Sequence, residues 1–255
     1  MTKFISRWAI AISLVGAASG ATPANDLLER TGERVKLFWE QFSAVTCTEE
    51  LVQEKLNEKG KTAIRSYSRY DYLIVLGWNK GELLVDESRV EVEAPRKGKP
   101  SGSLLATRGF ATLMFILHPD FQESYSFALP VQEPSGLMRI DFLPRSGARS
   151  PGALELKGRE YPILWEGSAW IDPATASVTR IEAAWKEPPE AIGLQSLKSD
   201  VSYGPVELRA KQAYWLPTSA KVSLQSLHQT WRNEHRFTKY RLFSVDVKDE
   251  VEVPK

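Results

Sequence analysis

From Cys47 onward, apolar and polar residues alternate along the chain in segments separated by turn sequences. Such alternation gives a strand one apolar and one polar face, which is typical of an antiparallel sheet that packs on one side. The clearest signals are residues 46–56, 62–76 and 82–93, joined by Asn57-Glu58-Lys59-Gly60 and Trp78-Asn79-Lys80-Gly81. They predict a meander of three long antiparallel strands.

Seven further strands are predicted downstream, giving ten or eleven in total: residues 124–132, 137–143, 159–172, 177–186, 194–203, 214–227 and 231–247. Alternation places Tyr161, Ile163, Trp165, Ala169 and Ile171 on one face of their strand, and Thr179, Ile181, Ala183 and Trp185 on one face of the next. No segment repeats at a fixed period, which excludes solenoids and propellers. No composition shift marks a boundary, so residues 22–255 are predicted to form one domain.

Two helices are predicted beside the sheet. Residues 26–44 carry apolar residues at helical spacing after a capping Asn25 or Asp26. Residues 109–117 form the most hydrophobic stretch of the mature chain and are expected to form a short helix that Pro119 ends. A helix that is apolar on every side must be buried. The predicted class is therefore mainly β (α+β), with a single curved antiparallel sheet, an N-terminal helix and an internal buried helix.

The N-terminus has the three parts of a secretory signal. Lys3 and Arg7 precede an apolar run over residues 8–18, and small residues follow, with cleavage expected after Gly20 or Ala21. The run is too short to span a bilayer, which takes about 20 residues. The only cysteine, Cys47, lies far from the cleavage point and cannot carry a lipid there. Residues 1–21 are thus predicted to be a signal peptide and the mature chain a soluble periplasmic protein.

Charge and motifs exclude several classes of function. Lys and Arg number 33 against 32 Asp and Glu, so the basic surplus that nucleic acids require is missing. No P-loop, G-x-S-x-G or dinucleotide fingerprint is present. Two of the three histidines, His228 and His235, are expected on opposite strand faces, which argues against a shared metal. No cofactor, metal or catalytic residue is predicted; a carboxylate pair formed only in the fold stays open.

Cys47 follows an apolar helix and has no cysteine partner, so we expect a buried, unreactive thiol. Seven of the eight tryptophans belong to the mature chain, most of them on predicted strands. A curled sheet leaves a concave apolar face that helices, a ligand or both must fill. Ordinary core packing is the simpler alternative to a ligand cavity. The expected cavity lining is Phe110, Leu113, Met114 and Leu117 on the internal helix and Trp165, Ile181, Trp185 and Val222 on the strands.

Two stretches of sequence resemble a known superfamily. Ala169-Trp170-Ile171-Asp172-Pro173 runs into Val178-Thr179-Arg180-Ile181-Glu182, which is similar to a strand pair of the LolA-like periplasmic lipoprotein and lipid carriers. Tyr214-Trp215-Leu216-Pro217 and the strand that follows fit the C-terminal layout of that group. The resemblance implies a half-open β barrel closed by helices. It also implies non-covalent carriage of a lipid or lipidated polypeptide, without enzymatic chemistry.

A second class of function stays open. The chain can instead be a ligand-free sensor or envelope interaction module. Its contacts would then come from the basic linker at residues 94–103 and from exposed strand edges.

Overall fold

The computed structural model describes residues 23–41, 44–79, 82–93, 113–156, 159–209 and 212–242. The predicted signal peptide, the linker at residues 94–103 and Phe110 lie outside the described residues. Two helices and two 3-10 helices are described: α1 (Pro23–Gln41), η1 (Leu113–Leu117), α2 (Pro119–Gln122) and η2 (Glu190–Ile192). The strands are β1 (Ala44–Leu56), β2 (Thr62–Asn79), β3 (Glu82–Glu93), β4 (Tyr125–Phe127), β5 (Val131–Gln132), β6 (Met138–Pro144), β7 (Ala153–Leu156), β8 (Arg159–Pro162), β9 (Trp165–Asp172), β10 (Ser177–Trp185), β11 (Leu194–Arg209), β12 (Gln212–Ser226) and β13 (Thr230–Leu242).

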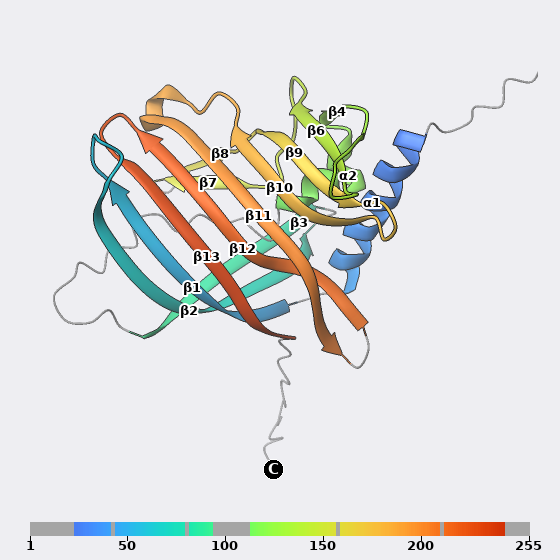
Figure 1. Ribbon diagram of the computed structural model, residues 1–255, viewed down its shortest axis with the longest axis horizontal. Helices are drawn as coiled ribbons and strands as arrows, with labels where there is room; N and C mark the ends of the chain where they lie inside the picture. Colours follow the sequence, from blue (N-terminus) through green and yellow to red (C-terminus); the bar gives the residue numbers. More distant parts are fainter. Residues whose placement is uncertain are drawn as a thin grey trace, which may run out of the picture.

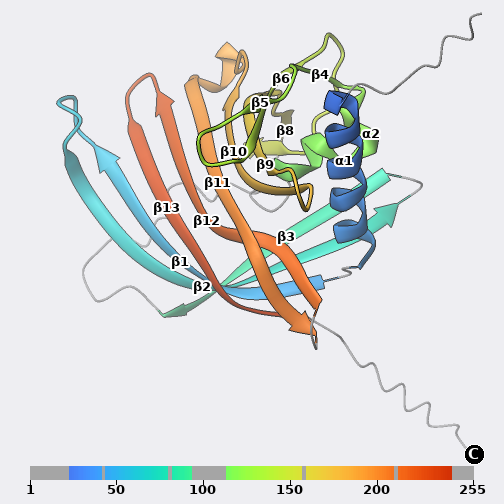
Figure 2. The same ribbon diagram turned by 45° about the vertical axis from the view of Figure 1, so that its right-hand side comes forward.

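One large antiparallel sheet dominates the fold (Figures 1 and 2). Its strand order is β3-β2-β1-β13-β12-β11-β10-β9-β6-β4, with β5 paired to β6. The last strand, β13, pairs with both β1 and β12, so the first and last strands are neighbours inside the sheet. The mainly β class and the large antiparallel sheet are confirmed. Within the described residues the sheet curves but does not close, because β3 and β4 stand at opposite ends of the order.

Two segments predicted as single strands are each divided in the structure. Residues 159–172 do not form one strand, because β8 pairs with β7 in a separate two-stranded sheet and β9 starts only at Trp165. Pro162 has no N–H for the ladder, so β8 ends there. Likewise residues 124–132 divide into β4 and β5 around Pro130. The described residues therefore hold thirteen strands: eleven in the large sheet, in agreement with the ten or eleven predicted, and two more in the small sheet, which was not predicted.

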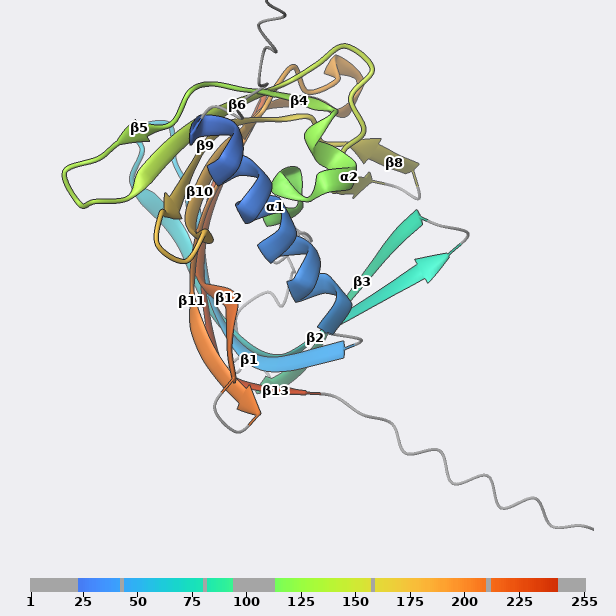
Figure 3. The ribbon, with the colours of Figure 1, turned by 90° about the vertical axis from the view of Figure 1, so that its right-hand side faces the viewer.

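Helix α1 lies across the concave side of the sheet (Figure 3). Leu27, Thr31 and Val35, spaced four residues apart, form its buried stripe, and Glu29 and Glu33 are exposed on the other face. The helix begins at Pro23, consistent with the preference of proline for the first turn. It packs on η1, α2 and β10. The predicted N-terminal amphipathic helix is confirmed, with its boundaries moved by three residues.

The internal apolar segment differs from the predicted helix. Its described part, η1, is a 3-10 helix in which all five residues are buried. Pro119 does not end a helix; it occupies the first turn of α2, where its fixed backbone angle is favourable. Gln122 of α2 donates to the carbonyl oxygens of Leu117 at 2.8 Å and Leu28 at 3.2 Å, and so ties η1 to α1. Gly32 allows this approach, since a Cβ there would lie 2.5 Å from the Gln122 amide nitrogen.

A β-bulge corrects the predicted inward face of β10. The pairing with β9 shifts between Val178 and Arg180, so Val178 is buried and Thr179 only half-buried. Ile181, Ala183 and Trp185 are buried as predicted. The extra residue shifts the alternation of inward and outward side chains by one position along β10. The periodicity of the sequence alone does not reveal such a bulge.

Candidate functional site

The strand register arranges the concave face of the sheet in rows, which together we call the concave floor. One row of successive Cα partners crosses six strands as Gln53, Asn233, Val222, Ser199, Ala183 and Gly167. The next row crosses as Leu51, His235, Ala220, Val201, Ile181 and Ala169. All of these except Gly167 are buried. From β9 to β12 these rows are apolar or small, whereas at β1 and β13 three of the four side chains are polar: Gln53, Asn233 and His235.

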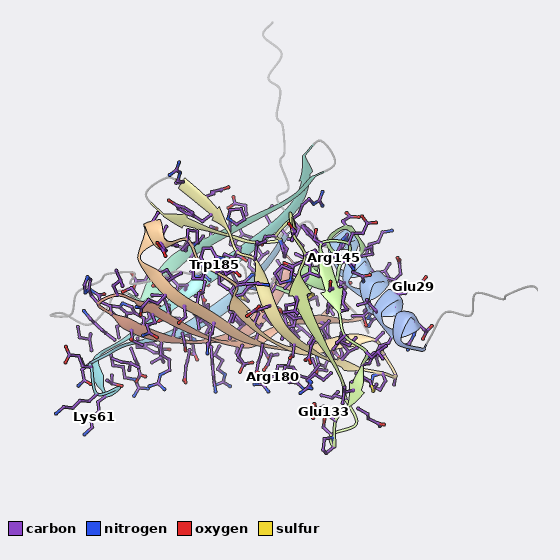
Figure 4. All side chains as sticks on the ribbon, turned by 90° about the horizontal axis from the view of Figure 1, so that it is seen from above. Glu29, Lys61, Glu133, Arg145, Arg180 and Trp185 are labelled. Carbon is purple, nitrogen blue, oxygen red and sulfur yellow. The ribbon has the colours of Figure 1, made fainter. Side chains whose placement is uncertain are left out.

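Seven of the eight predicted lining residues lie in one hydrophobic cluster, and the eighth, Phe110, is outside the described residues. Leu113, Met114 and Leu117 come from η1 and Trp165, Ile181, Trp185 and Val222 from the floor. In Figure 4 Trp185 lies among the strands, whereas Glu29 and Lys61 lie at the periphery. The predicted set is therefore brought together as one core.

Segment η1 contacts this core mainly through its apolar side chains. Its five side chains, Leu113 to Leu117, are at most 3% exposed. Its backbone bonds to the Tyr203 hydroxyl through Met114, and Gln122 holds its last carbonyl. Burial of the side chains thus supplies most of what keeps η1 in place.

A buried ionic cluster at the polar end of the floor is the main feature that the sequence did not reveal. The ionic cluster consists of Glu49 on β1, Arg89 on β3 and His235 on β13. Arg89 Nε lies 2.5 Å from Glu49 Oε2, and His235 Nδ1 lies 2.7 Å from Glu49 Oε1. The side chains of Glu49 and His235 are 0% exposed, and that of Arg89 is 10% exposed. Because Glu49 is ionised beside two donors, its buried charge is compensated.

Charge and burial set the protonation states of the cluster. Burial acts to raise the pKa of Glu49, but the His235 hydrogen bond and the Arg89 charge together hold that pKa below its usual range. Burial lowers the pKa of His235, and the neighbouring Glu49 opposes this only in part. The imidazole is therefore neutral near pH 7 and donates its Nδ1 proton to Glu49, which makes Nε2 an acceptor.

Aromatic rings enclose the cluster. The Arg89 guanidinium lies 4.3 Å from the centroid of the Tyr72 ring, and the His235 ring is stacked on Phe237 with centroids 6.2 Å apart. Burial and the charge of Glu87 raise the pKa of Tyr72, so its hydroxyl keeps its proton. Ring contacts as well as ion pairs therefore hold the side chains of the cluster in place.

Cys47, two residues from Glu49 along β1, is buried and free, as predicted. Burial raises the pKa of its thiol to about 12, against a smaller lowering by the hydrogen bond with Tyr240. A thiol in that state is a poor nucleophile.

Metal ligation finds no support in the part of the chain that the structure describes, where no group of three or more His, Cys, Asp and Glu residues could hold an ion. The prediction that His228 lies on a strand was wrong. His228 is exposed in the turn between β12 and β13, whereas His235 is buried on β13. Among the described residues no helix combines the length and apolar character needed to cross a membrane.

A shallow groove of about 390 Å³ lies on the outer side of α1 and contains none of the predicted residues. Arg30 crosses it from α1 and donates to the Pro173 carbonyl of the β9–β10 turn at 3.3 Å. Its lining mixes three carboxylates with two guanidinium groups, so most of the charge in the groove is balanced within it. The concave floor is therefore the stronger candidate site.

Comparison with models of protein families gives no match, and no curated protein matches the chain either.

Proposed function

We propose that the protein is a LolA-like periplasmic carrier that binds a lipid or lipidated polypeptide non-covalently on its concave floor. One observation carries this proposal: a short, wholly apolar segment, η1, is buried against α1, α2 and strand β10 of an open sheet. The sheet supplies an apolar concave surface, and the five apolar side chains of η1 cover part of it beside helix α1. An acyl chain is chemically equivalent to what η1 buries there.

The mechanism would be exchange of η1 for the ligand. Burial of an acyl chain contributes about 0.8 kcal/mol per methylene. A chain of about ten methylenes therefore gains roughly 8 kcal/mol, which offsets the ordering cost and leaves micromolar affinity. Release would follow when η1 returns to the floor or when a partner offers a better apolar surface.

The contact between Gln122 and η1 makes this exchange testable. Its side-chain amide bonds both α1 and η1, at the Leu28 and Leu117 carbonyls. If η1 competes with the ligand, Gln122→Ala weakens the competitor and strengthens ligand binding. Two hydrogen bonds of about 1 kcal/mol each correspond to a gain in affinity of up to about 30-fold.

The test measures binding of a fluorescent fatty acid to purified mature protein. Gln132→Ala is the matched control, because Gln132 is exposed on β5. We expect micromolar binding by the unaltered protein, tighter binding by Gln122→Ala and no change in the control. Native mass spectrometry of protein purified gently from its own periplasm should in addition show a lipid adduct.

The opposite results are equally clear. A homogeneous unliganded mass together with no fatty-acid binding would refute carriage and favour the ligand-free interaction module. A Leu113→Ala/Met114→Ala variant, which also weakens the competing segment, should bind the fatty acid more tightly, whereas Leu129→Ala/Leu143→Ala, at positions 75% and 52% exposed, should bind it unchanged.

A further inference from the structure

The concave floor contains a buried side-chain donor for which the described residues supply no acceptor. Gln53 on β1 is 3% exposed, and its amide nitrogen has no hydrogen-bond partner among the described residues. It lies on the concave side, because the neighbouring Glu54 on the other face pairs with Arg232. An unpaired buried amide is costly, since it has given up its bonds to water without replacement.

The position of Gln53 gives this amide a specific setting. It forms one row with Asn233 and Ser199, which are also buried, and the apolar Val222 lies between them. The ionic cluster begins one row away, where His235 is the Cα partner of Leu51. Glu49 Oε1 and Oε2 bond to His235 and Arg89, and the Gln53 amide nitrogen makes no hydrogen bond to the cluster.

We infer that Gln53 is a specificity residue of the proposed carrier site and donates a hydrogen bond to a neutral carbonyl at the head of the bound acyl chain. An ester or amide carbonyl is a good acceptor and carries no charge that burial would penalise. The apolar floor from Val222 to Ala183 would hold the hydrocarbon, and Gln53 would fix where the chain begins. This inference rests on the proposed function and specifies its ligand class as acyl esters or amides.

The test compares two ligands of similar length that differ in the carbonyl. Methyl dodecanoate and tridecane each displace the apolar dye 1-N-phenylnaphthylamine from the mature protein. Gln53→Met keeps the size and the unbranched shape of the side chain but removes the donor. We expect about a 10-fold loss of affinity for the ester and no loss for the hydrocarbon.

Gln132→Met, at an exposed glutamine, is the matched control and should change neither affinity. Gln53→Met is also expected to keep or raise Tm, because it removes an unpaired buried donor. A loss of ester affinity in this variant is therefore not expected to result from misfolding. Equal ester affinities in Gln53→Met and the unaltered protein, with dye and hydrocarbon still bound, would overturn the role of Gln53 alone. Failure of the unaltered protein to bind dye or hydrocarbon would instead overturn carriage itself.

Discussion

The imidazole of His235 and the carboxylate of Glu49 meet at 2.7 Å although 186 positions separate them in the chain. The contact exists because the first and last strands of the sheet, β1 and β13, are paired, with Glu49 opposite Phe237 and Leu51 opposite His235. Arg89 adds the third strand, β3, to the same carboxylate. The ionic cluster therefore links three strands across the polar end of the floor.

Stability should fall as the pH drops below about 6.5, the ordinary pKa of histidine. In the unfolded chain His235 takes up a proton in that range, whereas burial keeps it neutral in the folded state, so acid favours unfolding. The contribution of Glu49 has its own window: its folded pKa is below 4.5, so its stabilisation is present above that value and is lost in stronger acid. Thermal unfolding between pH 7.5 and 5.5 measures the histidine component.

His235→Gln retains a donor for Glu49 but cannot titrate. The decrease in Tm between pH 7.5 and 5.5 should be smaller in this variant than in the unaltered protein. His228→Gln provides the control, since His228 is exposed in a turn. An identical slope in His235→Gln and the unaltered protein would show that His235 does not stay neutral in the fold.

Removal of Arg89 should be among the most damaging single changes. Arg89→Met leaves the Glu49 carboxylate buried beside His235 alone, and loss of one partner of a buried pair costs about 3–5 kcal/mol. Arg65 also pairs with a glutamate, Glu54, but its side chain is 67% exposed. Arg65→Met is therefore expected to cost less than about 1 kcal/mol. Urea unfolding of both variants tests the difference, and equal losses would contradict it.

Substitution of Gly167 by any other residue is predicted to destabilise the fold for a steric reason. A Cβ at this position would lie 2.0 Å from the Glu182 carbonyl oxygen of the neighbouring strand, where the backbone cannot yield easily. Gly167→Ala should lose about 3 kcal/mol, at the upper end of the range for overpacking. Gly77→Ala is the control, because a Cβ there meets nothing within 4 Å. A stable Gly167→Ala protein would show that β9 and β10 can separate without loss.

Much of the fold could be read from the sequence because alternation and turn residues act locally. The β1–β2 turn at Asn57 formed as predicted, with the Asn57 side chain accepting from the backbone of Lys59 and Lys61. The inward faces of β9 and most of β10 also followed from periodicity. Boundaries failed where proline or a bulge interrupted the ladder, as at Pro162 and Thr179.

The ionic cluster was missed because Glu49 stands among other acids that look alike in composition. Its neighbours Glu50 and Glu54 are partly exposed on the other face of β1, whereas Glu49 shares the inward parity of Cys47 and Leu51. That parity was the available signal. No local pattern, however, indicates that His235 and Arg89 would compensate the charge, because that depends on strand pairing across the whole sheet.

Cys47 should be inert in the native protein. Burial leaves it 1% exposed and raises its thiol pKa to about 12, so at pH 8 only about one molecule in ten thousand carries the thiolate. Alkylation by iodoacetamide at pH 8 should therefore be at least about 100-fold slower than in denaturant, and should occur only through unfolding. Ser126→Cys in a Cys47→Ser background supplies an exposed thiol on β4 and should react at the rate of the unfolded chain. Rapid labelling of native Cys47, followed by mass spectrometry, would mean that β1 and β13 open far more often than a buried strand pair should.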